Sequence, residues 1–290
     1  MRFTVLIPTY NNGSCIRAAI ASVLRQNVHD FELFVVADGA PEETKAIAQE
    51  FAEADQRVRL FSFPKGERNG EYSRHMALQE ATGEAVCYLS DDDFWLPDHL
   101  ETMGALLRNA DFVHTRHMHL TTYFHIFGNQ GSLADPAIRQ RMLTEKYNLF
   151  GLSCSGHRLD AYRRLPVGWS PAPKDVWADL FMWRKWLSAP GMRYDGSSKP
   201  TSIHLGRELR LHADPALAPY ESIFWYHFFS NSKATDLLRA RLPQDESWLS
   251  ITDILVATCC PTKCMSLSSF LQRIRRRIVC ACRNSWNRGA

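Results

Sequence analysis

Three consecutive aspartates, Asp91, Asp92 and Asp93, directly follow a short apolar run. Adjacent carboxylates repel one another, and a folded chain holds them beside an apolar strand end only when water or a bound cation compensates their charge. Hard divalent ions such as Mg²⁺ and Mn²⁺ favour oxygen ligands, and Mg²⁺ is commonly held by one or two carboxylates together with a substrate phosphate. The triplet therefore predicts a site for a metal ion and a diphosphate. The alternative is a solvated acidic loop that caps a helix starting near Pro97.

The segments that lead up to this triplet alternate between strand and helix patterns. Short runs rich in apolar and β-branched residues predict buried strands at residues 3–8, 31–37, 57–63 and 84–89. Segments of helical periodicity separate them, and Pro41, Glu42 and Glu43 suit the first turn of one of these helices. Strands alternating with helices imply an α/β fold with a Rossmann-like, mostly parallel sheet flanked by helices.

Polar residues follow three of the predicted strands at the point where each strand ends. Thr9 and Tyr10 follow the first strand, Asp38 follows the second, and the aspartate triplet follows the fourth. Ligands of such sheets bind outside the carboxyl ends of the strands, so these side chains are expected to face one crevice. A dinucleotide is not expected there, because the first turn lacks the Gly-x-Gly-x-x-Gly pattern.

The composition predicts an ordinary globular protein. The chain has 290 residues, of which 45% are hydrophobic and 22% charged, which is enough for one large domain. No run approaches the roughly 18 apolar residues of a spanning helix, and the N-terminus begins with a strand pattern, so we expect a cytoplasmic protein. Three of the eight cysteines are dispersed and five crowd the C-terminus, and reduced thiols are expected for all of them.

Basic residues are concentrated at the C-terminus. Seven Lys and Arg residues and no acid follow Asp253, and without them the net charge changes from +3 to −4. The positive balance therefore belongs to this tail and does not indicate a nucleic-acid-binding domain. Residues 267–282 combine an apolar helical face with flanking arginines, which favours peripheral contact with an anionic inner membrane face or a partner. A plain terminal helix or a disordered end is the alternative, and the cysteine spacing does not match a CxxC…CxxC zinc site.

Five short motifs follow one another along the chain, at residues 5–11 (VLIPTYN), 35–39 (VVADG), 73–74 (SR), 81–84 (ATGE) and 88–95 (YLSDDDFW). With them the chain resembles the inverting family 2 glycosyltransferases of the GT-A fold, over residues 3–115 and more weakly to about 210. The resemblance implies transfer of a sugar from a nucleoside-diphosphate donor, with a UDP-sugar favoured, and with Mg²⁺ or Mn²⁺ as cofactor. The acceptor would be a glycan, a lipid-linked sugar or another hydroxyl compound.

The resemblance also implies a domain plan. A GT-A domain would cover residues 1–215, with a nucleotide-binding half at 1–115 and an acceptor-binding half at 116–215. Residues 216–290 are expected to form a helical, basic C-terminal extension.

Several donor-site roles follow from the resemblance. Thr9 and Tyr10 match the loop that packs on the base and ribose, and Arg74 matches an arginine that helps to hold the nucleotide. Asp38 matches an acid that accepts a hydrogen bond from the imino N–H of uracil or thymine. Many relatives have two acids there, whereas this chain has Ala37 before Asp38. A helix cap for Asp38 and a surface ion pair for Arg74 are the structural alternatives.

The aspartate triplet matches the DxD motif of the family. The resemblance places Asp91 near the ribose and Asp93 on the metal ion, and we assign Asp92 to donor binding with them. Some GT-A enzymes complete the metal site with a late histidine, and His204 ends a short strand-like segment at residues 200–204. Imidazole is a ligand for Mn²⁺, although oxygen ligands are preferred, and a structural histidine is the alternative.

Inverting transfer also requires a general base that takes the proton of the acceptor hydroxyl. Residues 178–184 (ADLFMWR) resemble the later Glu-Asp-x-x-Leu-Trp motif of the family, which makes Asp179 the candidate base. Ala178 replaces the first acid of that motif. Asp179 also suits the first turn of a helix, and Asp175 is a second candidate.

Four histidines, His114, His117, His119 and His125, lie in a segment that alternates like a hairpin around residues 128–131. Strand periodicity would place His117 and His119 on one face, as in a zinc-binding pair. No carboxylate or cysteine lies beside them, so contact with the acceptor or packing within the hairpin is favoured.

Two other classes of protein remain open. A nucleotidyltransferase also uses carboxylates on Mg²⁺, but no glycine-rich loop with a lysine follows the first strand. A non-catalytic relative that only binds a nucleotide or glycan is suggested by Ala37 and Ala178, which replace expected acids.

Overall fold

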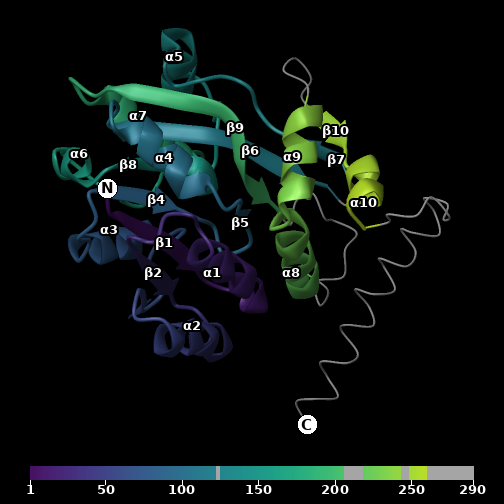
Figure 1. Cartoon of the computed structure of the whole chain (residues 1–290). Coiled ribbons are helices and arrows are strands. Elements are labelled where there is room, and N and C mark those ends of the chain that lie inside the picture. Colours follow the sequence, from purple (N-terminus) through teal and green to yellow (C-terminus); the bar gives the residue numbers. More distant parts are fainter. Residues whose placement is uncertain (122–124, 206–217, 243–247, 260–290) are drawn as a thin grey trace.

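Ten strands form one sheet in the computed structural model, which describes residues 1–121, 125–205, 218–242 and 248–259 (Figure 1). The strand order is β10-β7-β6-β8-β4-β1-β2-β3, and β9 pairs with β5 and β6. The strands are β1 (Phe3–Thr9), β2 (Phe31–Asp38), β3 (Val58–Phe63), β4 (Ala85–Tyr88), β5 (Phe94–Trp95), β6 (Phe112–Leu120), β7 (His125–Phe127), β8 (Ser155–Arg158), β9 (Tyr194–His204) and β10 (Trp248–Ser250). The helices are α1 (Ile16–Leu24), α2 (Glu42–Ala54), α3 (Glu71–Gln79), α4 (His99–Leu107), α5 (Pro136–Thr144), α6 (Leu159–Arg163), α7 (Ala178–Ser188), α8 (Ala218–Phe229), α9 (Ser232–Arg241) and α10 (Thr252–Cys259).

The first four strands pair in parallel, and β1, β2 and β4 are covered on both faces, whereas the edge strand β3 is partly exposed. Val5 on β1 packs in a core with Ile20 of α1, whereas the next residue, Leu6, faces a second core with Leu78 of α3 and Trp183 of α7. Successive side chains of a strand point to opposite faces, so a strand covered on both sides has to be apolar along its whole length. Full burial of each such side chain contributes about 1.5–3 kcal/mol.

Antiparallel pairing extends the sheet beyond β4. The strand β8 pairs antiparallel with both β4 and β6, and β9 returns parallel to β6. The predicted α/β architecture with a mostly parallel sheet is confirmed, and each antiparallel pair in the described structure includes at least one strand that follows β6.

Strand register assembles the predicted crevice. Leu6 of β1 is paired with Tyr88 of β4, and Thr9 is paired with Ala37 of β2, so the loops after these strands leave the sheet at one edge. Farther along the chain, Phe94 of β5 is paired with Ile203 of β9. This pairing places the preceding Asp93 beside His204.

The described residues after position 217 form the helices α8, α9 and α10 and one strand of the sheet, β10. Helices α8, α9 and α10 enclose a third core that contains Trp225, Leu238 and Ile254, and β10 pairs antiparallel with β7. Helix α8 lies beside α1, which attaches the extension to the N-terminal half (Figure 1). The basic segment at 267–282 and the cysteines beyond residue 259 lie outside the described residues. In the part of the chain that is described, no helix is both long and apolar enough to span a bilayer.

The predicted position of the histidine hairpin is wrong. Leu120 is paired with Ile126, so the chain reverses between β6 and β7, and residues 128–131 follow β7. The predicted common face of His117 and His119 is confirmed, since their ring centroids lie 4.8 Å apart. Cys15, Cys87 and Cys154 are buried, and neither Cys87 nor Cys154 forms a disulfide within the described residues.

Candidate active site

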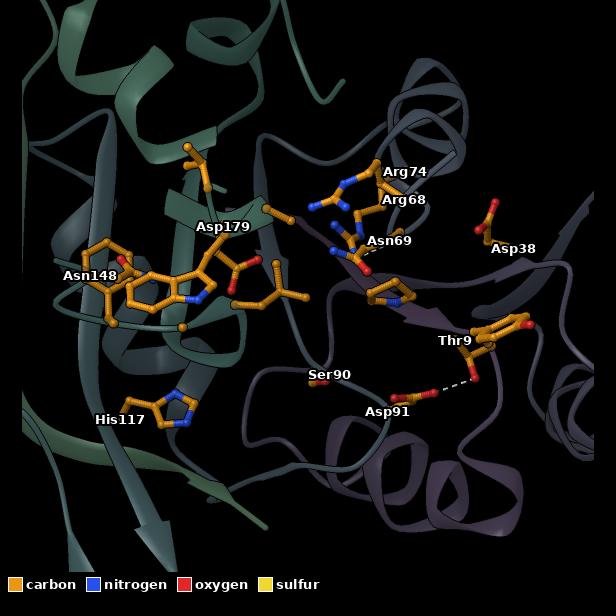
Figure 2. Close-up of a pocket in the computed structure, with 18 of the residues that line it drawn as sticks. Thr9, Asp38, Arg68, Asn69, Arg74, Ser90, Asp91, His117, Asn148 and Asp179 are labelled. Atoms are coloured by element: carbon orange, nitrogen blue, oxygen red, sulfur yellow. Dashed lines mark hydrogen bonds between the residues drawn. The ribbon is translucent and has the colours of Figure 1, made fainter. Parts of the chain in front are cut away.

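A cavity of about 840 Å³ lies at the sheet edge where β1, β2 and β4 end (Figure 2). Six of the residues assigned from the sequence to donor binding or to the general base line it: Thr9, Tyr10, Asp38, Arg74, Asp91 and Asp179. Asp93 and His204 lie next to the cavity. They cluster with His117, which lines the cavity wall. Residues far apart in the sequence therefore meet at one place.

Asp38 is a buried carboxylate held by three donors. It accepts hydrogen bonds from the Ser73 hydroxyl at 2.7 Å and the Gly66 N–H at 3.0 Å, and it pairs with the Lys65 ammonium at 2.6 Å. Burial raises the pKa of Asp38, but these donors outweigh it and the pKa lies below its ordinary value. Gly70 has φ +75°, and a Cβ there would lie 2.9 Å from the Asp38 Cβ, so only glycine fits beside this carboxylate.

Arg74 lines the same wall from α3 and is 6% exposed. One guanidinium nitrogen donates to the Asn69 carbonyl at 2.9 Å, and the group lies 4.8 Å from the centroid of the Trp169 ring. The other two nitrogens are buried without a hydrogen-bond partner among the described residues. Buried donors are normally satisfied, so this guanidinium suits an anion such as a phosphate in the cavity.

Thr9, Tyr10 and Asp91 form the part of the site after β1. The Thr9 hydroxyl donates to Asp91 at 2.6 Å, and the Asn12 amide donates to the other oxygen of Asp91. Burial and the neighbouring charge of Asp92 raise the pKa of Asp91 to about 7. Tyr10 is 47% exposed at the cavity, and the Lys65 ammonium lies 5.2 Å from its ring centroid.

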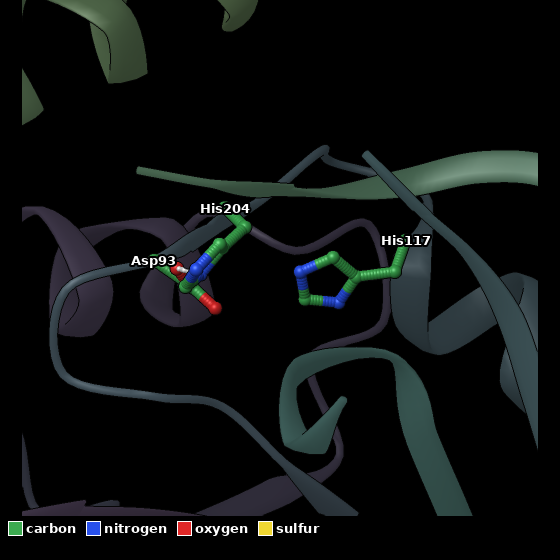
Figure 3. Close-up of side chains that lie close together, drawn as sticks. All are labelled: Asp93, His117 and His204. Atoms are coloured by element: carbon green, nitrogen blue, oxygen red, sulfur yellow. Dashed lines mark hydrogen bonds and ion pairs between the residues drawn. The ribbon is translucent and has the colours of Figure 1, made fainter. Parts of the chain in front are cut away.

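Asp93, His117 and His204 form a compact cluster, and Figure 3 shows the His117 ring pointing toward the other two side chains. One potential ligand atom from each residue lies within 4.8 Å of the others, and His204 Nδ1 is 2.6 Å from an Asp93 oxygen. Burial raises the pKa of Asp93, but attraction and hydrogen bonding from His204 outweigh it and lower the pKa. Burial also lowers the pKa of His117 well below its usual range, so this imidazole is neutral.

The cluster fits a divalent metal ion. Both ring nitrogens of His117 are buried without a hydrogen-bond partner in the described structure, although a neutral imidazole offers one donor and one acceptor. Burial and like charge raise the pKa of both Asp91 and Asp92, so a nearby cation would offset the repulsion between these carboxylates. Two imidazoles and one carboxylate suit Mn²⁺, Fe²⁺, Co²⁺ or Zn²⁺ better than Mg²⁺, which prefers oxygen.

The neighbouring side chains fix the cluster from outside. Ser153 donates to the second oxygen of Asp93 and accepts the Ser90 N–H at 3.0 Å. The Ser90 hydroxyl donates to Asp92 at 2.9 Å, so Asp92 is held by its own loop. This arrangement leaves Asp93 as the carboxylate of the triplet that belongs to the His117 and His204 cluster.

Asp179 lies in the first turn of α7 and lines the cavity. Burial raises its pKa above the ordinary value, and the charge of Arg74 opposes this only in part. A carboxylate with a raised pKa is a stronger base than an ordinary aspartate. The second candidate, Asp175, is exposed at the rim of the same cavity.

Sequence reasoning missed three residues of the site. Lys65 and Arg68 lie in the loop after β3, and Arg68 has the left-handed backbone angle φ 59° at the cavity, which is unusual for a residue other than glycine. His117 was assigned to acceptor contact or hairpin packing, whereas the structure places it with Asp93 and His204. Its alternation with His119 was the only sequence signal.

Comparison with known proteins identifies a family for the chain. The sequence model described as "Glycosyl transferase family 2" matches residues 4–163, which is more than half of the chain. A GalNAc(5)-diNAcBac-PP-undecaprenol beta-1,3-glucosyltransferase of Campylobacter jejuni is 29% identical over 128 residues, covering 44% of this chain and 38% of that protein. WfgD of Escherichia coli, a UDP-Glc:alpha-D-GlcNAc-diphosphoundecaprenol beta-1,3-glucosyltransferase, is 32% identical over 109 residues, covering 37% and 41%. The matched segments thus span about two fifths of the length of these two relatives.

Solved structures share the fold. S. aureus TarS 1-349 in complex with UDP-GlcNAc superposes with a TM-score of 0.54 at 19% identity, covering 89% of this chain and 71% of that one. The mannosyltransferase PcManGT of Pyrobaculum calidifontis, in complex with GDP-Man and Mn²⁺, gives a TM-score of 0.51 at 17% identity, covering 96% and 80%. At this level of identity the likeness establishes the architecture, which is that of the GT-A glycosyltransferases.

Proposed function

Since the chain belongs to glycosyl transferase family 2, we propose that it is a metal-dependent inverting glycosyltransferase that moves a sugar from a nucleoside-diphosphate donor to a hydroxyl acceptor. The observation that carries the proposal is that one cavity combines a half-buried carboxylate with a raised pKa, Asp179, and a buried guanidinium, Arg74, with two nitrogens that have no partner among the described residues. A general base and an anion site are the two groups that such a transfer requires.

The donor is proposed to lie along the wall formed by the loops after β1, β2 and β3. Tyr10 provides an aromatic surface for the base, and Asp38 is held by Lys65 and Ser73 where it can accept a hydrogen bond. Arg74 would contact the diphosphate. A UDP-sugar is favoured, since a relative and a structural neighbour are named for UDP-Glc and UDP-GlcNAc.

Asp93, His117 and His204 would hold the metal ion, with Mn²⁺ preferred to Mg²⁺. When bound, the ion would act as a Lewis acid that neutralises negative charge on the diphosphate. The protein fixes its own ligands in advance, because Ser153 and the β5–β9 pairing hold Asp93 and His204 in place.

Asp179 is the proposed base. As the acceptor oxygen attacks the anomeric carbon of the donor sugar, Asp179 takes its proton. The bond from that carbon to the diphosphate oxygen breaks, and the electron pair leaves with the nucleoside diphosphate. Attack from the face opposite the leaving group inverts the anomeric configuration.

The acceptor and the location are also proposals. The two named relatives act on acceptors linked through a diphosphate to undecaprenol. We propose a glycan, lipid-linked or other hydroxyl acceptor for this chain, reached in the cytoplasm, and peripheral membrane contact through the basic residues after Asp253.

Donor turnover tests the proposal. The purified chain is incubated with UDP-, GDP- and dTDP-sugars with and without Mn²⁺, and release of the nucleoside diphosphate is measured. We expect slow Mn²⁺-dependent hydrolysis of one donor, which the Asp93→Asn variant lacks. Binding of a nucleotide without turnover of any donor, with or without candidate acceptors, would instead favour a non-catalytic relative.

A further inference from the structure

The cavity has a second wall, opposite the donor residues, that the donor does not explain. Two segments form it, residues 146–152 after α5 and residues 174–179 at the start of α7. Figure 2 shows Asn148 and Asp179 on one side of the cavity and Thr9 and Asp38 on the other. Because the candidate base lies on this second wall, the acceptor has to approach it.

An exposed aromatic ring stands on this wall. Trp177 immediately precedes α7, two residues before Asp179, and is 51% exposed at the cavity. The Lys146 ammonium lies 5.2 Å from its ring centroid, and half of the residue surface remains open even so. Exposing a large apolar ring at a polar cavity forgoes hydrophobic stabilisation, so the ring suits the apolar C–H face of a sugar.

Two lysines line the same cavity as this ring. Lys146 and Lys174 are both exposed and line the cavity, and neither forms a salt bridge within the described residues. On the donor wall, by contrast, Lys65 is bound to Asp38 at 2.6 Å. Asp175 and Asp179 also line the second wall, so its two lysines and two acids balance in charge. Because neither ammonium is held in an ion pair in the described part of the chain, both remain available to an anion that enters the cavity.

A third feature of this wall is an unsatisfied acceptor. The Asn148 side-chain oxygen is buried without a hydrogen-bond partner in the described part of the chain, and Asn148 lines the cavity. Buried amide oxygens are normally paired, and a sugar hydroxyl is a fitting donor.

We propose that this wall is an acceptor subsite for a sugar that carries a phosphate group. The pyranose ring stacks on Trp177, one hydroxyl donates to Asn148, and the phosphate contacts Lys146 and Lys174. A second hydroxyl faces Asp179 and receives the donor sugar. This inference rests on the proposed function, and it names the acceptor class and the residues that select it.

Binding of matched probes tests the subsite. The chain is saturated with UDP and Mn²⁺ and titrated calorimetrically with glucose, galactose, mannose and N-acetylglucosamine, each as the methyl glycoside and as the 1-phosphate. We expect at least one 1-phosphate to bind about tenfold more tightly than its methyl glycoside. The same sugar linked to citronellyl diphosphate then distinguishes a lipid-linked acceptor from a soluble one. Tighter binding than that of the 1-phosphate indicates a lipid-linked acceptor, and equal affinity indicates a soluble sugar phosphate.

Variants assign the interaction to the named residues. Lys146→Ala with Lys174→Ala should abolish the preference for phosphate, and Trp177→Ala should weaken glycoside and phosphate alike by about fivefold. Trp177→Phe should restore most of this loss, and Tyr72→Ala, which removes an exposed aromatic on α3, should change nothing. Unchanged UDP affinity in every variant shows that the donor site is intact.

Equal binding of glycosides and 1-phosphates, or undiminished binding by Trp177→Ala, would overturn the subsite while leaving the proposed function standing. If UDP itself fails to bind the wild-type chain with Mn²⁺, the proposed function fails first.

Discussion

Replacing Asp179 with asparagine should remove catalysis and leave the donor site intact. The asparagine side chain has nearly the same shape but cannot take a proton, so the variant loses the contribution of a general base. Such groups typically contribute 10²–10⁴-fold in rate, or about 2.7–5.4 kcal/mol of the activation barrier. The carboxyl lies on the wall opposite Asp38 and Thr9, and UDP affinity should therefore be unchanged (Figure 2).

The raised pKa of Asp179 adds two further expectations. The base acts when deprotonated, so the wild-type rate should rise with pH through a pKa above the ordinary aspartate value, and the variant should lack this limb. An acid whose pKa is raised on folding binds more protons in the native state, so it lowers stability as pH increases. Asp179→Asn should therefore be at least as stable as the wild type at neutral pH.

The assay is nucleoside diphosphate release from the preferred donor, with calorimetric UDP binding and thermal unfolding measured on the same samples. Asp175→Asn is the matched control, since it alters a carboxylate at the rim of the same cavity. Asp179→Asn retaining more than about a tenth of the wild-type rate, against the expected loss, would refute the assignment. A selective loss in Asp175→Asn would transfer the role to that residue.

Three other changes have defined outcomes. His117→Asn should weaken Mn²⁺ binding at least about tenfold, measured from the free Mn²⁺ signal by electron paramagnetic resonance, whereas an equal effect of His119→Asn would contradict the cluster. Glu32 accepts hydrogen bonds from Thr4, Thr82 and Gly83, so Glu32→Gln should cost about 2 kcal/mol in urea unfolding; unchanged stability would refute this. Burial lowers the pKa of His157 to about 4, and because the unfolded state protonates first, this residue should contribute about 3 kcal/mol to the loss of stability from pH 6.5 to 4, a contribution that His157→Gln should remove.

The sheet and the donor wall were predictable because they depend on local patterns. Apolar runs at β1 and β2 give strands buried on both faces, and parallel strands end at one edge. That rule alone brings Thr9, Asp38 and Asp91 together, and the structure places all three on one cavity.

His117 was not predictable because its position depends on long-range register. The pairing of β6 with β9 is irregular between His114 and His117, and these shifts decide which side chains of β6 face His204. An irregularity of this kind changes the face of every later residue of a strand. Lys65 and Arg68 were missed for a different reason, since they lie in a loop after β3 that has no periodicity.

UDP binding with and without Mn²⁺ is the most direct test of the central claim, that Asp93, His117 and His204 hold a metal ion beside a nucleotide site. Isothermal titration of UDP should give tight binding to the wild type only when Mn²⁺ is present, and Asp93→Asn should lose the metal-dependent gain while it remains folded. UDP binding that is equally tight without Mn²⁺ and in Asp93→Asn would contradict it.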